Sequence, residues 1–185
     1  MHDLSADGRL MLGTVGWERD DWLDSYYPPD LPPEWRPAYY ANDCGCVLLT
    51  ADFWCGMDPE LLAEALDELG GRLQFFLEQP PGCPEPARAR LSLFASSPAI
   101  LLVDRPHPGC SLLPQWISQG SGVWVDTDSG ASLLSWPLAV MNLRELRIRA
   151  ETLPASVRAL VLDGPAASPG RVPELRTLLE LMGMA

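Results

Sequence analysis

The chain has 185 residues, 47% hydrophobic and 21% charged, which is an ordinary composition for one globular domain. Its formal net charge is −12, and all thirteen positive residues are arginines because the sequence contains no lysine. This charge would repel nucleic acid and anionic membranes, and the missing lysine excludes a Schiff-base lysine and a Walker-type phosphate loop. We expect no nucleic-acid partner and no membrane partner. We also expect a cytoplasmic protein, because no apolar run reaches the ~20 residues of a membrane-spanning helix.

Seven short apolar runs predict β-strands. Continuous apolar runs of this kind are typical of parallel strands that are buried on both faces under helices. The first run precedes a glycine-rich junction, and each of the other six ends in an acidic residue. In chain order the runs are Leu10–Val15, Val47–Asp52, Leu73–Glu78, Ala99–Asp104, Val123–Asp126, Leu146–Glu151 and Ala159–Asp163.

The segments between these runs predict helices. The clearest covers residues 58–70, where Asp58 is a suitable N-cap, Pro59 suits the first helical position and Gly70 or Gly71 ends the helix. The last segment, 173–183, repeats this design. Further helices are predicted over 86–95, 112–119 and 131–142, with Pro137 interrupting the last of these.

The alternating elements predict one α/β domain over residues 1–185. The acidic ends at positions 52, 78, 104, 126 and 151 lie 26, 26, 22 and 25 residues apart, which resembles a repeated β-α unit. The last interval, 12 residues to position 163, breaks the period. We expect a small, irregular or incomplete parallel β/α barrel similar to a TIM barrel, and an open doubly wound sheet stays as the alternative. A long excursion rich in proline and aromatic residues occupies 18–46.

A motif in and around this excursion resembles a known family. It consists of Gly13-Thr14, Gly16-Trp17, Trp22, Tyr26-Tyr27-Pro28, Tyr39-Tyr40-Ala41, Val47 and Phe53-Trp54. The order and spacing of these residues are similar to the opening pattern of the YecE-like family, domain of unknown function 72, which has a TIM-barrel-like fold. The resemblance implies a shortened and diverged member. Leu48 and Thr50 stand where the family pattern has a glutamate and an asparagine, so an inward carboxylate of the second strand is missing.

The strand ends predict where a site lies. In a parallel barrel the carboxyl ends of the strands meet at one face, so the acids that follow them should surround one mouth. Crowded carboxylates raise one another's pKa values or attract a divalent cation such as magnesium or manganese. The alternative for each acid is a structural role, as a helix cap or turn former. The acids concerned are Asp52, Glu78, Asp104, Asp126, Asp128, Glu151 and Asp163.

The glycine and aromatic residues of the first junction suggest a ligand contact as well. Glycines at the end of a strand let the backbone turn sharply or approach a ligand, and neighbouring aromatic side chains can wall a pocket. The structural alternative is that the glycines relieve crowding and the aromatic rings pack in the core. Together with Asp52, Asp126 and Asp163, the predicted ligand-binding residues are Gly13, Gly16, Trp17, Trp22, Tyr27 and Trp54.

Three residues are candidates for catalysis. Asp104 and His107 lie within four residues at one predicted strand end, and Glu78 ends another strand. His107 is the only histidine outside the N-terminal tail, so any imidazole-based proton transfer depends on it. The alternative is that Arg105 pairs with a neighbouring acid and His107 is a solvated loop residue.

The cysteines predict neither a metal site nor a disulfide framework. Five cysteines are scattered along a chain that is large enough to need no covalent staples, so we expect reduced thiols. Cys44-Gly-Cys46 has the wrong spacing for a zinc knuckle, and no second pair accompanies it. Nucleotide-binding fingerprints are absent, so no metal ligand is assigned and the cofactor, if the protein uses one, is unknown.

Two functional hypotheses follow from the sequence. The first is a small-molecule or divalent-cation site at the carboxyl mouth of the strands, with no reaction assigned. The second is a non-catalytic interaction or scaffold protein derived from a barrel enzyme, favoured by the lost acid and the short chain. An eroded barrel would leave apolar edges that a second copy could cover, so homo-oligomerisation is compatible with this hypothesis.

Overall fold

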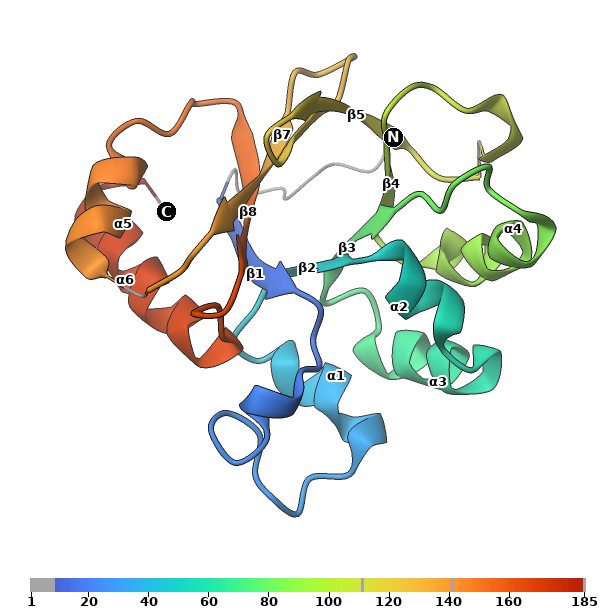
Figure 1. Cartoon of the computed structure of the whole chain (residues 1–185), viewed down its shortest axis with the longest axis horizontal. Helices are drawn as coiled ribbons and strands as arrows, with labels where there is room; N and C mark the ends of the chain where they lie inside the picture. Colours follow the sequence, from blue (N-terminus) through green and yellow to red (C-terminus); the bar gives the residue numbers. More distant parts are fainter. Residues whose placement is uncertain (1–8, 111, 141, 185) are drawn as a thin grey trace.

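In the part of the chain that the structure describes, eight strands form one closed barrel (Figure 1). The computed structural model describes residues 9–110, 112–140 and 142–184. Each strand pairs with the next along the chain, and the last pairs with the first. The strands are β1 (Met11–Val15), β2 (Cys46–Leu49), β3 (Gln74–Glu78), β4 (Ala99–Val103), β5 (Gln115–Gly120), β6 (Val123–Val125), β7 (Ser132–Pro137) and β8 (Val157–Asp163).

One strand runs in the opposite direction to the others. β6 is antiparallel to both of its neighbours, β5 and β7, whereas the remaining neighbouring pairs are parallel. Turns without helices join β5 to β6 and β6 to β7. The predicted irregular β/α barrel is therefore confirmed, and the pairing of β1 with β8 excludes the open sheet.

Helices cover the outside of most of the barrel. Figure 1 shows α5 and α6 beside β8 and α2 to α4 beside β2 to β4, with no helix outside β5 and β7. None of the described helices is long and apolar enough to span a membrane. The α-helices are α1 (Arg36–Tyr40), α2 (Ala51–Gly56), α3 (Pro59–Leu69), α4 (Glu85–Leu91), α5 (Leu143–Ala150) and α6 (Val172–Leu181), and the 3-10 helices are η1 (Asp20–Trp22), η2 (Pro33–Trp35), η3 (Ser92–Ser96), η4 (Pro108–Cys110) and η5 (Pro169–Arg171).

Three predicted helices are confirmed. The Asp58 carboxylate caps α3 by accepting hydrogen bonds from the backbone N–H groups of Glu60 and Leu61, at 2.8 and 3.2 Å. Gly70 ends α3 with a left-handed φ of 54°. The predicted segments 86–95 and 173–183 correspond to α4 followed by η3 and to α6.

The strand predicted over Leu146–Glu151 is wrong, because this segment belongs to α5. Its alternating apolar and polar residues match the period of a strand, but Asn142 provides a helix cap. The Asn142 side chain accepts hydrogen bonds from the backbone N–H groups two and three residues later. Leu146 and Ala150 are the buried residues of α5, and their spacing of four places them on one helix face.

The helices predicted over 112–119 and 131–142 are also wrong. These segments contain β5 and β7, which were missing from the predicted strand set. Short apolar runs fit both periods, and here the long-range pairing of β5 with β4 and of β7 with β8 decides. Pro137, expected to interrupt a helix, is the last residue of β7.

The core has two layers because side chains alternate across the barrel wall. In β2, Val47 and Leu49 pack against the surrounding helices, whereas Cys46 and Leu48 point into the barrel. The buried residues of the barrel interior are Cys46, Leu48, Phe76, Ile100, Leu102, Trp116, Leu133, Ala159 and Val161.

One pair of cysteines departs from the expected reduced state. Cys83 and Cys110 form a disulfide, because neighbouring parallel strands β3 and β4 place the loops that follow them side by side. Cys44, Cys46 and Cys55 are free, as expected. Burial raises the pKa of the Cys44 thiol to about 12 and also raises the pKa of Cys46, so both are poor nucleophiles.

Gly13 in β1 and Gly16 directly after it are each explained by the local backbone. A Cβ atom on Gly13 would lie 1.8 Å from the carbonyl oxygen of Cys46. The Tyr40 hydroxyl lies beside Gly13 as well. It accepts a hydrogen bond from the Thr14 N–H at 2.8 Å and donates one to the Cys46 carbonyl at 2.9 Å. Gly16 has a φ of 72°, and its N–H donates to the Leu48 carbonyl at 2.7 Å. Both positions therefore have a structural reason to be glycine.

Gly13→Ala should destabilise the protein by about 3 kcal/mol, because the β1–β2 pair must separate to admit the methyl group. Gly56→Ala is the matched control: Gly56 ends α2, and a Cβ there meets no heavy atom within 4 Å. The control should be neutral or stabilising by up to about 1 kcal/mol. Urea denaturation followed by circular dichroism measures both changes. Equal stability of the two variants would contradict the proposed contact.

Candidate functional site

Two acids project toward the barrel axis at the carboxyl ends of their strands. In β3, Phe76 points into the barrel, so Glu78, two residues later, lies on the same side of the strand. In β8, Val161 points inward, and Asp163 follows it in the same way. Because β3 and β8 are parallel, both carboxylates lie at the same mouth of the barrel.

Glu78 is an acid whose pKa is clearly raised. Burial of its half-buried carboxyl group raises its pKa, and the charges of Asp163 and Asp52 raise it further. A hydrogen bond accepted from the Ala51 N–H at the start of α2 acts in the opposite direction. Asp52 lies in the first turn of α2, not at the strand end where it was predicted, since β2 already ends at Leu49. The predicted convergence of carboxylates is therefore seen for three acids.

A cavity of about 210 Å³ opens beside this acidic group. Asp163 and Thr50 form part of its wall. Two further lining residues, Arg19 and Glu18, already have charged partners. Arg19 binds Asp21 and donates to the Gly164 carbonyl at 2.8 Å. The lining residues are Val15, Gly16, Glu18, Arg19, Thr50, Phe53, Leu162 and Asp163, and Glu18 forms an ion pair with Arg36. Arg19, Thr50 and Phe53 were missed because the tertiary fold, not a sequence pattern, places them there.

The four aromatic residues predicted to wall a pocket are buried in the core. Trp17, Trp22, Tyr27 and Trp54 are each exposed by 2% or less, and none lines either cavity described for this barrel. Their polar atoms bond to backbone carbonyls: Trp22 Nε1 to Ala167 at 3.0 Å, Trp54 Nε1 to Glu78 at 2.9 Å, and the Tyr27 hydroxyl to Trp17. They support the mouth by fixing its loops, and Trp54 holds the backbone of Glu78.

Three of the predicted acids lie elsewhere. Asp126 and Asp128 follow β6, whose reversed direction carries them to the opposite end of the barrel. Glu151 is the C-cap of α5, which leads to the start of β8. The Asp126 carboxylate closes a turn by accepting hydrogen bonds from the Asp128 N–H at 3.2 Å and the Ser129 hydroxyl at 2.5 Å. The expectation of one ring of seven acids is wrong for these three positions.

The Asp104–His107 segment forms a loop after β4. Asp104 is exposed, and His107 is half-buried. The His107 N–H donates to Gln115 Oε1 and the His107 carbonyl accepts from Gln115 Nε2, both at 2.9 Å, so β5 holds this loop through one side chain. The charges that act on Glu78 come from Asp163 and Asp52, so the three predicted catalytic candidates do not form one group.

The chemistry of a metal centre is not assembled in the described part of the chain. Residues 9–110, 112–140 and 142–184 contain no group of three or more histidine, cysteine or acidic residues that could hold a metal ion.

Comparison with known proteins identifies the fold. No family model and no curated protein matches the sequence. Among solved structures, a DUF72 family protein from Thermotoga maritima matches with a TM-score of 0.55 and 12% identity, over 93% of this chain and 99% of that chain. The chain has the fold of the DUF72 family. The resemblance of the sequence to the YecE-like pattern is thus confirmed at the level of the fold.

The positions that depart from the DUF72 pattern have different surroundings. Leu48 is 2% exposed and packs inside the barrel, where it adds apolar contact in place of the expected carboxylate. Thr50 lines the mouth cavity and offers a hydroxyl group there. In this DUF72 fold the inward acids come from β3 and β8, not from β2.

Glu78→Gln should change the pH dependence of stability. Because the folded-state pKa of Glu78 is raised above its ordinary value of 4.5, its stabilising contribution is present at low pH and is lost as the pH rises through the folded-state pKa. Glutamine stays uncharged, so the free energy of unfolding of the variant should increase relative to wild type as the pH rises from 4 to 7. Urea titrations across this range measure the difference. A difference that is constant or falls with pH would contradict the raised pKa.

Proposed function

We propose that the protein binds a small, positively charged organic molecule at the carboxyl mouth of its barrel. The observation that carries the proposal is the inward pair Glu78 and Asp163: burial and the charge of Asp163 raise the pKa of Glu78, and Asp163 lines the mouth cavity. A cation placed between them would relieve their repulsion and gain two charge-assisted hydrogen bonds.

The size and charge of the mouth restrict the ligand. A cavity of about 210 Å³ is smaller than the roughly 300–1,000 Å³ of a site for drug-sized molecules, so it suits a few heavy atoms. The net charge of −12 attracts cations over long distances. Ammonium and guanidinium groups donate hydrogen bonds to single carboxylates, which matches the arrangement better than a magnesium or manganese ion.

Glu78 gives the site a proton-dependent component. Its raised pKa means that a neutral form is more accessible than for an exposed glutamate, and a bound cation would favour the charged form. Ligand binding should therefore strengthen as the pH rises. The same group is suited to donate or accept a proton, although the proposal concerns binding and includes no reaction.

A scaffold function is the second candidate. The specific observation in its favour is the outer face of β5, β6 and β7, which no helix covers in Figure 1. Ile117, Val123, Val125 and Leu134 are half-buried there. An uncovered sheet face of this kind is a surface that a protein partner can bind.

Calorimetry and thermal-shift measurements with methylguanidinium, ethylammonium, magnesium and acetate test the proposed mouth site. A ligand that prefers the folded state raises its stability by RT ln(1 + [L]/Kd). We expect stabilisation by the two organic cations and none by acetate. Glu78→Gln and Asp163→Asn should each weaken cation binding about tenfold, because each removes a charged acceptor.

Asp67→Asn is the control for net charge, since Asp67 is exposed on α3 and lines neither cavity. Its cation affinity should equal that of wild type. Equal losses in Asp67→Asn and Glu78→Gln, or the absence of any cation effect in the folded wild-type protein, would overturn the proposal. Binding of magnesium alone would also overturn it in favour of a metal site.

A further inference from the structure

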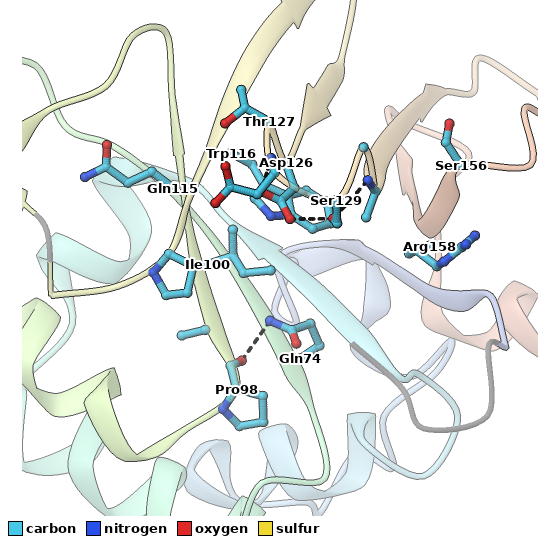
Figure 2. Close-up of a pocket in the computed structure, with 15 residues that line it drawn as sticks. Gln74, Pro98, Ile100, Gln115, Trp116, Asp126, Thr127, Ser129, Ser156 and Arg158 are labelled. Carbon is cyan, nitrogen blue, oxygen red and sulfur yellow. Dashed lines mark hydrogen bonds between the residues drawn. The ribbon is translucent and has the colours of Figure 1, made fainter. Parts of the chain in front are cut away.

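The largest cavity described for this protein lies at the end of the barrel opposite the mouth. Its volume is about 840 Å³, and it shares no lining residue with the mouth cavity. Figure 2 shows Ile100, Gln74 and Pro98 along one side and Asp126, Thr127 and Ser129 along the other. The first group belongs to the starts of β3 and β4, and the second belongs to the turn after β6.

The reversed strand creates this cavity. In a barrel of parallel strands the interior is filled by stacked layers of side chains. Here β6 has three residues, and the turn from Asp126 to Ala131 returns the chain to β7 at the amino-terminal end. Because the Asp126 carboxylate fixes this turn through the Asp128 N–H and the Ser129 hydroxyl, the turn is a defined wall of the cavity.

The inner wall is apolar. Pro98, Ile100, Pro114 and Trp116 line it, and the ring of Phe76 lies 5.5 Å from that of Trp116, between centroids. Ile100 and Trp116 are members of the interior core, so the cavity reaches the buried layer of the barrel. A volume of this size with an apolar wall and a few polar groups is typical of a small-molecule site.

Of the long polar side chains that line the cavity, the two glutamines have paired donors, and Arg158 uses one guanidinium nitrogen for the backbone. Gln74 Nε2 donates to the carbonyls of Phe75 and Pro98, both at 3.0 Å, and Gln115 is paired with His107. Arg158 Nη1 donates to the carbonyls of Ala155 and Val157, at 2.7 and 3.2 Å.

Negative charge is more available at this cavity than positive charge. The carboxylates of Asp126 and Asp128 lie on one wall, and the guanidinium of Arg158 is held against the backbone at the start of β8. A ligand with an apolar body and a positive end therefore matches the wall and the rim together. An anionic group placed near Asp126 would meet the acidic turn and lose hydration there.

We propose that this cavity is a second binding site, for an apolar molecule that carries one ammonium group. The apolar body lies against Ile100 and Trp116, and the ammonium group lies near Asp126. The site is separate from the proposed function, because it depends on the β6–β7 turn and not on Glu78.

The experiment uses the intact chain carrying Glu78→Gln, so that binding at the mouth is weakened. Three probes of similar shape are compared: 2-phenylethylammonium, 2-phenylethanol and phenylacetate. The readout is the indole N–H signal of Trp116 in nitrogen-15 NMR spectra, together with calorimetry. We expect the ammonium compound to shift this signal and bind most tightly, the alcohol to bind more weakly and the carboxylate not to bind.

Two variants separate the apolar and the charged contributions. Ala131→Leu adds a larger side chain to the cavity wall and should weaken 2-phenylethylammonium binding about tenfold by occupying its space. Asp126→Asn keeps the turn, because asparagine forms the same side-chain turn, but removes the charge and should weaken binding about threefold. Asp67→Asn, on the exposed face of α3, changes the net charge equally and should have no effect.

The proposal is overturned if none of the probes moves the Trp116 signal at millimolar concentration, or if phenylacetate binds as well as the ammonium compound. Unchanged binding in folded Ala131→Leu would also overturn it. If Ala131→Leu does not fold, the comparison of Asp126→Asn with Asp67→Asn decides, since equal affinities would contradict a charge contact. Failure of these tests leaves the mouth site unaffected, because that site is measured with other probes and other variants.

Discussion

The structure depends on one geometric constraint: a side chain on a barrel strand points inward or outward by its position, and the direction of the strand decides at which end it lies. Glu78 and Asp163 reach the same mouth because their strands are parallel and their positions are inward. Asp126 follows its strand just as directly, but β6 is reversed. Strand direction therefore places Glu78 and Asp163 at one end of the barrel and Asp126 at the other. There Asp126 fixes the turn that lines the large cavity.

The motif that resembles the YecE-like family is used mainly for packing. Tyr26, Tyr27 and Tyr39 form mutual edge-to-face ring contacts that fold the excursion between β1 and β2 onto itself. The Tyr26 hydroxyl donates to the Asp43 carboxylate at 3.0 Å, and Arg176 from α6 donates to the Asp43 carbonyl at 2.6 Å. The excursion between β1 and β2, whose aromatic residues were predicted to wall a pocket, instead connects the start of the barrel to α6 near its end.

Local sequence signals predicted those parts of the fold that local interactions determine. Asp58 and Gly70 mark the ends of α3 because capping involves neighbouring residues only. The nature of β5 and β7 depends on pairing with strands elsewhere in the chain, so their short and partly polar sequences did not distinguish strand from helix. The segment that begins at Leu146 was predicted as a strand from its alternating apolar and polar residues. It is helical because Asn142 caps α5, a local signal that the prediction did not use.

The candidate site was predictable to the same extent. Glu78 and Asp163 could be placed at one mouth from the strand pattern, since both follow strands that are predicted correctly. The cavity at the other end was not predictable, because it exists only through the reversal of β6, and a three-residue strand carries no signal of its direction. The buried state of Trp17 and Trp54 could not be read from the sequence either, since an aromatic residue after a strand suits a pocket wall and a core equally well.

The direction of β6 is tested most directly by NMR. The Asp126 N–H donates to the Ala131 carbonyl and the Ser135 N–H to the Gly122 carbonyl, so the pairs between them alternate, and Val123–Leu134 and Val125–Ser132 are the close, non-hydrogen-bonded pairs. The structure predicts strong Hα–Hα nuclear Overhauser effects within both pairs. Their absence, with contacts typical of parallel neighbours instead, would contradict the reversed strand and with it the separation of the acids between the two ends of the barrel.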